Sequence, residues 1–400
     1  MNVPKLRFKE FSGEWEEKTF RDIVSLNLVP VEKPNTDYVR LGIRSHCKGT
    51  FHELVKIEDL LEADKMFLVP KDNLILNITF AWEHAIAITD ENDEGKYVSG
   101  RFPTFAFKKN EVPTFYESII RSKRMKYELG VASPGGAGRN RVLNKELFLD
   151  IPVKTTDFEE QTKIAEFVKC IDEKIENQKL IVESLEKQKK ALMKKIFSQE
   201  LRFKDDDGKE FPDWEEKKLG EVGCFTKGGN LSKADLSDEG TECILYGELY
   251  TRYSEIAEKI VSKTSVEETV LCLSKVNDVL LPSSGETPED ISTATCILRE
   301  GVALGGDIIV YRSDLLDGRF NSYLLNHKCK LDIAKIAQGK SVVHINANAL
   351  KNIVVPVPCL HEQNKIVEFL FCLSNKIESE RNVLGHWQQI KKGLLQQMFV

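Results

Sequence analysis

The chain has 400 residues, more than the roughly 250–300 at which a single hydrophobic core stops growing, so we expect two domains or more. Its hydrophobic fraction of 41% and charged fraction of 30% are those of a globular protein, without an apolar run long enough to cross a membrane and without a signal-peptide pattern. We therefore expect a cytoplasmic protein with no membrane association. A net charge of −6 gives no overall attraction to nucleic acid, so any DNA binding must depend on local basic segments.

The chain begins with a short segment that occurs again near its middle. Residues 6–23 read LRFKEFSGEWEEKTFRDI, and residues 201–222 read LRFKDDDGKEFPDWEEKKLGEV, with Trp15 and Trp214 at corresponding places. A longer block follows each copy, and these two blocks, 24–150 and 223–354, do not align with one another. The pattern indicates a duplicated frame that carries two diverged domains.

Both blocks are predicted to be mixed α/β domains. Short apolar runs bounded by turn residues predict strands, and longer amphipathic runs predict helices. The predicted strands are at 72–82, 148–153, 277–285 and 352–358, and the predicted helices are at 115–130 and 319–339.

In the first block, basic side chains are concentrated in residues 121–141, which contain six basic residues and one acidic residue. Glycines within this segment allow backbone conformations that other residues resist, and arginine and asparagine can form two hydrogen bonds with a base edge or a phosphate. A solvated helix face followed by an ordinary turn is the alternative. The candidate DNA contacts are Arg121, Lys123, Arg124, Arg139, Asn140 and Arg141, together with Arg44 and Ser45 of the segment 40–49.

In the second block, a predicted helix again ends at a glycine and is followed by a basic, hydroxyl- and amide-rich loop within 326–350. The sequence Gln338-Gly339-Lys340-Ser341 lacks the first glycine of a phosphate-binding P-loop, and His344 has no second metal ligand at a useful spacing. Ordinary turns are the alternative here too. The candidate DNA contacts are Lys340, Ser341, His344 and Asn346, with Lys227, Asn230 and Lys233 in 225–236 and Ser283 and Ser284 in 282–290.

Each block is followed by a long repeat: EQTKIAEF at 160–167 returns as EQNKIVEF at 362–369, and the correspondence continues without a gap to 197 and 399. Apolar residues recur at alternating steps of four and three, from Ile164 to Ile196 and from Ile366 to Met398, which is typical of a coiled coil. Both copies carry polar residues at matching seam positions, among them Lys189 and Lys391. At 1.5 Å per residue, each helix would be about 57 Å long.

No catalytic or metal site is predicted. The sequence has no Pro-Pro pair of the kind that adenine methyltransferases use, and Glu215-Glu216-Lys217 belongs to the repeated frame rather than to a nuclease motif. Nine cysteines occur singly, which argues against a disulfide framework and against a zinc ribbon.

The order of these segments resembles the specificity subunit of bacterial type I restriction-modification enzymes. The resemblance rests on LRFKEFSGEWEEK, on LRFKDDDGKEFPDWEEKKLGEV and on the two EQ-x-KI-x-EF helices, and it covers essentially the whole chain. It implies two target recognition domains that each read one half of a bipartite double-stranded DNA site, and an antiparallel coil that sets the distance between them. It also implies methylation subunits that modify adenine and restriction subunits that translocate and cleave DNA.

We therefore expect a mixed α/β fold with a pseudo-two-fold, circular internal repeat and a long antiparallel two-helix coiled coil as the spacer. The expected segments are a first recognition domain at 1–159, the first helix at 160–199, a second recognition domain at 200–361 and the second helix at 362–400. No cofactor is expected in this chain, with S-adenosylmethionine, ATP and Mg on the partner subunits. The alternative is a coiled-coil scaffold that joins two protein-binding domains, and a self-contained nuclease or methyltransferase is a more distant one.

Overall fold

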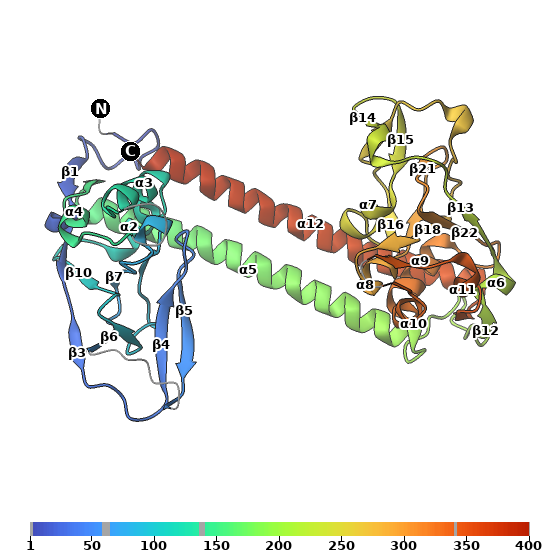
Figure 1. The fold of residues 1–400 in the computed structure, drawn as a ribbon, viewed down its shortest axis with the longest axis horizontal. Helices are drawn as coiled ribbons and strands as arrows, with labels where there is room; N and C mark the ends of the chain where they lie inside the picture. Colours follow the sequence, from blue (N-terminus) through green and yellow to red (C-terminus); the bar gives the residue numbers. More distant parts are fainter. Residues whose placement is uncertain (1–2, 58–64, 136–140, 340–341, 400) are drawn as a thin grey trace. The chain divides into compact units, whose positions relative to one another are not determined.

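The computed structural model describes residues 3–57, 65–135, 141–339 and 342–399. Its contacts divide the chain into two compact units (Figure 1). Unit 1 consists of residues 1–179 and 382–400, and unit 2 consists of residues 180–381. Both long helices, α5 (Phe158–Phe197) and α12 (Leu360–Met398), therefore contribute one part to each unit.

Unit 1 contains three sheets and several short helices. The five-stranded sheet has the order β3-β6-β9-β4-β5, the four-stranded sheet has the order β2-β10-β7-β8, and β1 pairs with β11. The strands are β1 (Glu16–Thr19), β2 (Val24–Leu26), β3 (Val29–Val31), β4 (Tyr38–Ile43), β5 (Thr50–Val55), β6 (Met66–Leu68), β7 (Asn73–Leu76), β8 (Ile86–Ile88), β9 (Tyr97–Ser99), β10 (Thr104–Phe107) and β11 (Pro152–Thr155). The helices are α1 (Phe20–Ile23), the 3-10 turn η2 (Ala81–Glu83), α2 (Pro113–Ile120), α3 (Lys123–Val131) and α4 (Lys145–Leu149).

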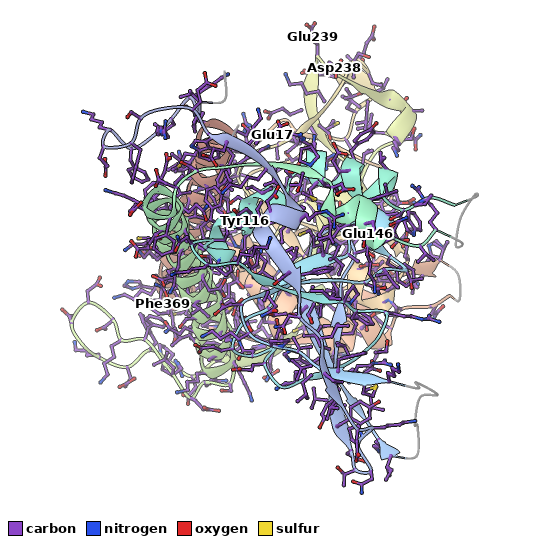
Figure 2. The ribbon with its side chains drawn as sticks, turned by 90° about the vertical axis from the view of Figure 1, so that its left-hand side faces the viewer. Glu17, Tyr116, Glu146, Asp238, Glu239 and Phe369 are labelled. Atoms are coloured by element: carbon purple, nitrogen blue, oxygen red, sulfur yellow. The ribbon has the colours of Figure 1, made fainter. Side chains whose placement is uncertain are left out.

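The main core of unit 1 joins the domain to both long helices. Phe20 stacks on Phe148 with ring centroids 4.9 Å apart, and the same cluster contains Ile164 of α5 and Met398 of α12. Figure 2 shows Tyr116 of α2 and Glu146 of α4 within this unit. Because apolar burial stabilises by about 25 cal/mol per Å², a shared core of this kind holds the domain firmly against its helix segments.

Unit 2 is also mixed α/β. Its sheets have the orders β13-β22-β18-β20-β16 and β14-β17-β15-β21, with the pairs β12-β24 and β19-β23. The strands are β12 (Glu215–Lys218), β13 (Cys224–Lys227), β14 (Leu236–Ser237), β15 (Thr241–Ile244), β16 (Ile256–Ala257), β17 (Ser262–Thr264), β18 (Asp278–Pro282), β19 (Ser284–Gly285), β20 (Thr295–Ile297), β21 (Ala303–Leu304), β22 (Ile308–Arg312), β23 (Val343–His344) and β24 (Val354–Val357). The helices are α6 (Leu219–Val222), η3 (Lys233–Asp235), α7 (Tyr246–Thr251), η4 (Glu268–Val270), α8 (Pro288–Ile291), α9 (Gly318–His327), α10 (Lys330–Lys335) and α11 (Ala347–Leu350).

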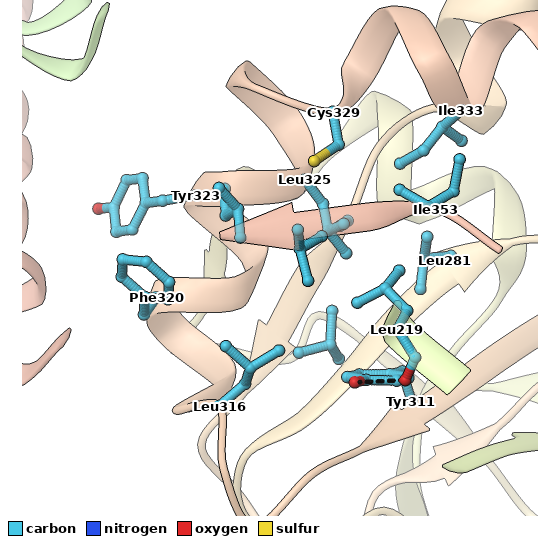
Figure 3. Packing of buried hydrophobic residues seen from close by; sticks show 14 of the residues in the cluster. Leu219, Leu281, Tyr311, Leu316, Phe320, Tyr323, Leu325, Cys329, Ile333 and Ile353 are labelled. Carbon is cyan, nitrogen blue, oxygen red and sulfur yellow. Dashed lines mark hydrogen bonds between the residues drawn. The ribbon is translucent and has the colours of Figure 1, made fainter. Parts of the chain in front are cut away.

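The main core of unit 2 is formed where α9 packs on the five-stranded sheet (Figure 3). The hydroxyl of the buried Tyr311 donates to the carbonyl oxygen of Leu219 at 3.1 Å, so its polar end is satisfied within the core. Ile196 of α5 and Ile366 of α12 belong to the same cluster. Unit 2 therefore repeats the arrangement of unit 1, with helix segments built into the core of the domain.

The two long helices run antiparallel within each unit. In unit 1, Asp172 of α5 accepts from Lys391 of α12, and in unit 2, Glu186 of α5 accepts from Arg381 of α12 at 2.5 Å. The residue number on α12 falls as the number on α5 rises, in agreement with the shared cores. The predicted mixed α/β fold with two long paired helices is confirmed, and buried seam residues include Ile164, Ile171, Ile175, Val182, Ile366, Leu370 and Ile377.

Several predicted elements differ in detail. The predicted helix 115–130 is wrong as a single element, because α2 ends at Ile120 and Ser122 caps a new helix by accepting from the backbone N–H of Met125. The predicted helix 319–339 is likewise divided into α9 and α10. The predicted strand 72–82 ends at Leu76, and the segment 148–153 completes α4 before β11 begins. In the described part of the chain, no helix is long and apolar enough to cross a membrane.

Candidate nucleic-acid interface

Each of the two long repeats begins with a buried glutamate. This glutamate anchors the frame segment of the same unit, which is residues 6–23 in unit 1 and 201–222 in unit 2. Arg7 donates through two nitrogens to Glu160, both at 2.7 Å, and Arg202 donates to Glu362 at 2.7 and 2.9 Å. Neither carboxylate is exposed to solvent. The hydrogen bonds to these carboxylates raise the pKa of both arginines, so both guanidinium groups remain charged near neutral pH.

The glutamine that follows each carboxylate holds a helix of the neighbouring domain. The side-chain oxygen of Gln161 accepts from the backbone N–H of Val112 at 2.9 Å, and that of Gln363 accepts from the backbone N–H of Asp317 at 2.8 Å. Val112 and Asp317 are the N-cap residues of α2 and α9. Two domains with unrelated sequences therefore attach one helix to the frame in the same way.

The remaining repeated letters also have matching contacts. Lys163 pairs with Glu10, and Lys365 pairs with Asp206 at 2.6 Å. Phe8 meets Phe167 edge to face at 5.6 Å between ring centroids, and Phe203 meets Phe369, labelled in Figure 2, at the same distance. The sequence EQ-x-KI-x-EF thus recurs because, in each unit, its residues on the long helix bind one frame segment and one helix of the domain.

The frame also repeats a backbone contact near each LRFK segment. The N–H of Leu201 donates to the carbonyl of Lys195 at 3.1 Å, and the N–H of Leu6 donates to the carbonyl of Gln397 at 2.9 Å. Lys195 and Gln397 occupy corresponding places in the two long repeats. In unit 2 this hydrogen bond joins residues that are close in sequence, whereas in unit 1 it joins residues that are far apart in sequence.

In unit 1, several candidate residues lie on neighbouring segments. Ser45 donates to Glu83 at 2.7 Å, and the ring of His84 contacts the carbonyl of Ile120 at 2.6 Å, which joins the 44–47 loop, η2 and the end of α2. Burial lowers the pKa of His84, so this ring is neutral at neutral pH. Arg44 is exposed and lies over the ring of Phe51.

Arg141 closes this group of segments by binding the end of α3. It donates to the carbonyls of Ser133 and Gly130 at 3.1 and 2.5 Å, and its guanidinium lies 5.6 Å from the ring centre of Trp82. Two nitrogens of its guanidinium therefore donate within the domain. Arg139 and Asn140 lie outside the described residues.

Arg121, Lys123 and Arg124 are exposed where α2 ends and α3 begins. The ion pairs Arg121–Glu117 at 3.4 Å and Arg124–Glu128 at 4.0 Å connect neighbours on the same helix surface. Exposed pairs of this kind contribute little to stability, so these cations are free to exchange partners with a phosphate. They form the accessible basic edge of unit 1.

In unit 2, the structure brings three candidates to one groove. A cavity of about 800 Å³ is lined by Lys227, Asn230 and Lys233, which extend from the end of β13 into η3. Tyr246 and Tyr250 of helix α7 and its C-cap residue Arg252 also line this groove. These three residues were not among the predicted DNA contacts, although the run from Tyr246 to Arg252 combines aromatic and basic side chains in the way that nucleic-acid surfaces often do.

Acidic side chains also border this groove. Glu248, Glu286 and Asp307 are among its lining residues. Glu248 is engaged by the hydroxyl of Ser262 at 2.6 Å and by the backbone N–H of Leu245 at 2.9 Å. Figure 2 shows two further acids, Asp238 and Glu239, in the turn that joins β14 to β15. The approach of an anionic backbone is therefore favoured on the lysine side of the groove.

The remaining candidates of unit 2 are partly committed to the fold. Ser284 is buried and contacts the Nδ1 atom of His344 at 3.0 Å, across the pair β19-β23. Ser283 is half-buried and pairs through its backbone with Asp307 and Ile345. Asn346 is the N-cap of α11 and accepts from the N–H of Ala349 at 2.9 Å. Lys340 and Ser341 lie outside the described residues.

The chain is similar to proteins of one kind. Residues 212–385 match the family described as the type I restriction modification DNA specificity domain. The chain is 27% identical over 298 residues to the type I restriction enzyme MjaVIII specificity subunit of Methanocaldococcus jannaschii, an alignment that covers 69% of this chain and 68% of that protein.

Two solved structures share the fold. The crystal structure of a type I restriction-modification system S subunit from M. genitalium matches with a TM-score of 0.59 at 15% identity, over 100% of this chain and 99% of that one. A chain from a structural study of complex assembly and conformational transition of the type I R-M system matches with a TM-score of 0.58 at 16% identity, over 96% and 97%. The chain is thus similar in sequence to the specificity subunits of type I restriction-modification systems, and it shares the fold of these solved structures.

Proposed function

We propose that this chain is the DNA-reading subunit of a type I restriction-modification complex, in which each domain recognises one half of a bipartite double-stranded target. The observation that carries the proposal is the repeated frame. Two unlike domains are held on the paired helices by the same two contacts. One is the arginine–glutamate fork, in which an arginine donates through two nitrogens to a glutamate, and the other is the hydrogen bond between a glutamine and the N-cap residue of a domain helix. A frame that fixes orientation while its two domains differ is suited to reading an asymmetric, divided site.

The basic edge of unit 1 and the groove of unit 2 are the surfaces we assign to DNA. Exposed cations supply phosphate contacts, and amide and aromatic groups can contact bases. An acidic chain can still bind DNA in this way, because affinity depends on the cations that face the duplex rather than on the net charge of −6.

The chain itself is proposed to be non-catalytic. Methylation subunits that bind S-adenosylmethionine would modify adenine, and restriction subunits that use ATP and Mg would translocate and cleave the DNA. The paired helices are proposed to set the spacer and to dock the methylation subunits, in the cytoplasm.

The proposal is tested by expressing the chain with methylation subunits and mapping the methylated adenines in the host genome. We expect one asymmetric bipartite motif with a fixed spacer. Replacement of residues 24–150 by the corresponding block of a relative should change one half of the motif and leave the other half and the spacer unchanged. Absence of motif-specific methylation, or a protein that binds no DNA with its partner subunits, would instead support a scaffold role.

A further inference from the structure

Lys189 occupies a seam position of α5, and its counterpart in the other repeat, Lys391, lies 202 residues later. Lys391 pairs with Asp172, a residue of the opposite helix. The residue that corresponds to Asp172 in the second repeat is Ser374, which carries no charge. Lys189 therefore has no carboxylate partner at the equivalent place on α12.

Lys189 contacts a carboxylate of the second domain instead. Its Nζ atom lies 3.5 Å from Glu255, which also contacts the Nε2 atom of His327 at 2.9 Å. The side chains of Lys189 and Glu255 are only 14% and 15% exposed. Shielding from water strengthens the attraction between the two charges and makes the loss of one partner costly.

Glu255 is held in place by the five-stranded sheet. Its carbonyl accepts from the N–H of Cys296 at 2.8 Å, and the neighbouring carbonyl of Ser254 accepts from the hydroxyl of Thr295 at 2.9 Å. Both bonds connect the start of β16 to β20. The backbone that carries the carboxylate is thus fixed to the sheet, and movement of the sheet relative to α5 would break the contact with Lys189.

Tyr323 completes the junction between the domain and both helices. Lys189 lies 5.1 Å from the centre of its ring, and its hydroxyl contacts that of Ser374 on α12 at 3.2 Å. A cavity of about 540 Å³ adjoins these residues and is lined by α5, by α12 and by residues 252–261. These polar contacts therefore lie beside an open space and add to the packing of the helix segments in the core of unit 2.

We propose that the Lys189–Glu255–His327 cluster is a positioning device that fixes the tilt of the second domain on its helices and thereby the spacer length that the complex accepts. This inference rests on the proposed function. The first domain has a different arrangement, since Lys391 binds the opposite helix. The two domains therefore share the arginine–glutamate and glutamine–N-cap contacts but differ in the contact of this seam lysine.

The test is Glu255→Gln, a nearly isosteric change, in the full chain assembled with methylation subunits. The preference for the wild-type spacer over spacers one base pair longer or shorter is measured from genome-wide adenine methylation. We expect this preference to fall by about tenfold, the change that follows the loss of one shielded charged hydrogen bond. Both half-site sequences should remain unchanged.

Two variants separate positioning from simple stabilisation of the helix pair. Ser374→Asp combined with Glu255→Gln gives Lys189 a partner on α12, as Asp172 is for Lys391, so it creates a charged contact between the helices without the domain contact. It should leave the spacer relaxed. Asp172→Asn, which removes an ion pair between the helices of unit 1, should keep the wild-type spacer preference.

A wild-type complex with a fixed spacer and a Glu255→Gln complex with the same fixed spacer would overturn the inference and leave the proposed function intact. Restoration of the spacer by Ser374→Asp would likewise overturn it in favour of helix stabilisation. If the wild-type complex methylates no bipartite motif, both the proposed function and this inference fail.

Discussion

The buried glutamates Glu160 and Glu362 do more than neutralise an arginine. Glu362 also accepts from the indole N–H of Trp214 at 2.8 Å, so one carboxylate fixes two side chains of the frame segment. In unit 1, the hydroxyl of Thr156 contacts the matching Glu160, while the buried indole nitrogen of Trp15 has no hydrogen-bond partner among the described residues. Both units therefore have the arginine–glutamate fork, but the further hydrogen bond to the glutamate comes from Trp214 in unit 2 and from Thr156 in unit 1.

Glu362→Gln should destabilise unit 2 strongly, because it leaves the Arg202 guanidinium in a largely shielded place without its counter-charge. Loss of one member of a buried pair costs about 3 kcal/mol or more. Denaturant unfolding of the full chain would measure the change. Glu368→Gln, on an exposed position of the same helix, should alter stability by less than about 0.5 kcal/mol. Equal effects of the two variants would contradict this account.

The carboxylate of Glu255 should make the second unit sensitive to acid. Burial alone would raise its pKa, but the hydrogen bond with His327 and the charge of Lys189 lower it to about 2 from an ordinary value of 4.5. A group with a depressed pKa stabilises the fold above the unfolded value, and this contribution is lost as the pH falls from 4.5 toward 2.

At neutral pH, this shift corresponds to about 3 kcal/mol. The difference in unfolding free energy between the wild type and Glu255→Gln should therefore shrink as the pH is lowered from 6 to 3, which denaturant titrations at each pH would measure. A difference that does not vary with pH would show that the charge of Glu255 does not contribute.

Lys227 and Lys233 are the groove residues whose loss should affect DNA binding most directly. The double variant Lys227→Ala/Lys233→Ala, in complex with methylation subunits, should weaken binding and lower the slope of log affinity against log salt by up to about 1.8, if both contact phosphates. Lys204→Ala/Lys209→Ala, which removes two exposed lysines from the frame turn, is the matched control. An unchanged slope in the groove variant would place the DNA elsewhere.

The long helices were predictable because their contacts depend on a regular period and on repeated letters. The short elements were less so. The amphipathic pattern of residues 115–130 continues across Arg121 and Ser122, and only the capping bond to Met125 shows that a new helix begins there. Ser284 and Asn346 appeared as free polar groups in the sequence, but a buried contact and a helix cap use them. Tertiary contacts, which no local pattern contains, decide such cases.

If the paired helices set the distance between the half-sites, shortening both helices together should shorten the DNA spacer that the complex accepts. Deletion of 178–184 with 380–386 removes one heptad from each, which is about 10 Å at 1.5 Å per residue. At 3.4 Å per base pair, this corresponds to about three base pairs of DNA. Methylation mapping should show both half-sites unchanged with a shorter spacer. An unaltered spacer would contradict the proposal that the helices set the spacer length.

Each unit combines one domain with segments of both long helices, so neither helix belongs to one domain alone. Damage to a helix segment is therefore expected to affect the domain whose core contains it, as Ile164 does in unit 1 and Ile196 in unit 2. The repeated sequence predicted the two long helices, but not that each helix contributes to both units. The two domains could not be aligned by sequence, and their common attachment became visible only through the N-cap contacts of Val112 and Asp317.

The hydrogen bond from Leu6 to Gln397 reproduces, between residues at opposite ends of the numbering, the bond from Leu201 to Lys195. In unit 2 the frame segment follows the long helix directly along the chain, whereas in unit 1 it meets the end of the other long helix without a covalent link. The same hydrogen bond forms in both units. A gene rearranged so that its second half is translated first would encode the same set of frame contacts, and the order of the halves in such a gene would say nothing about which half of the target each one reads.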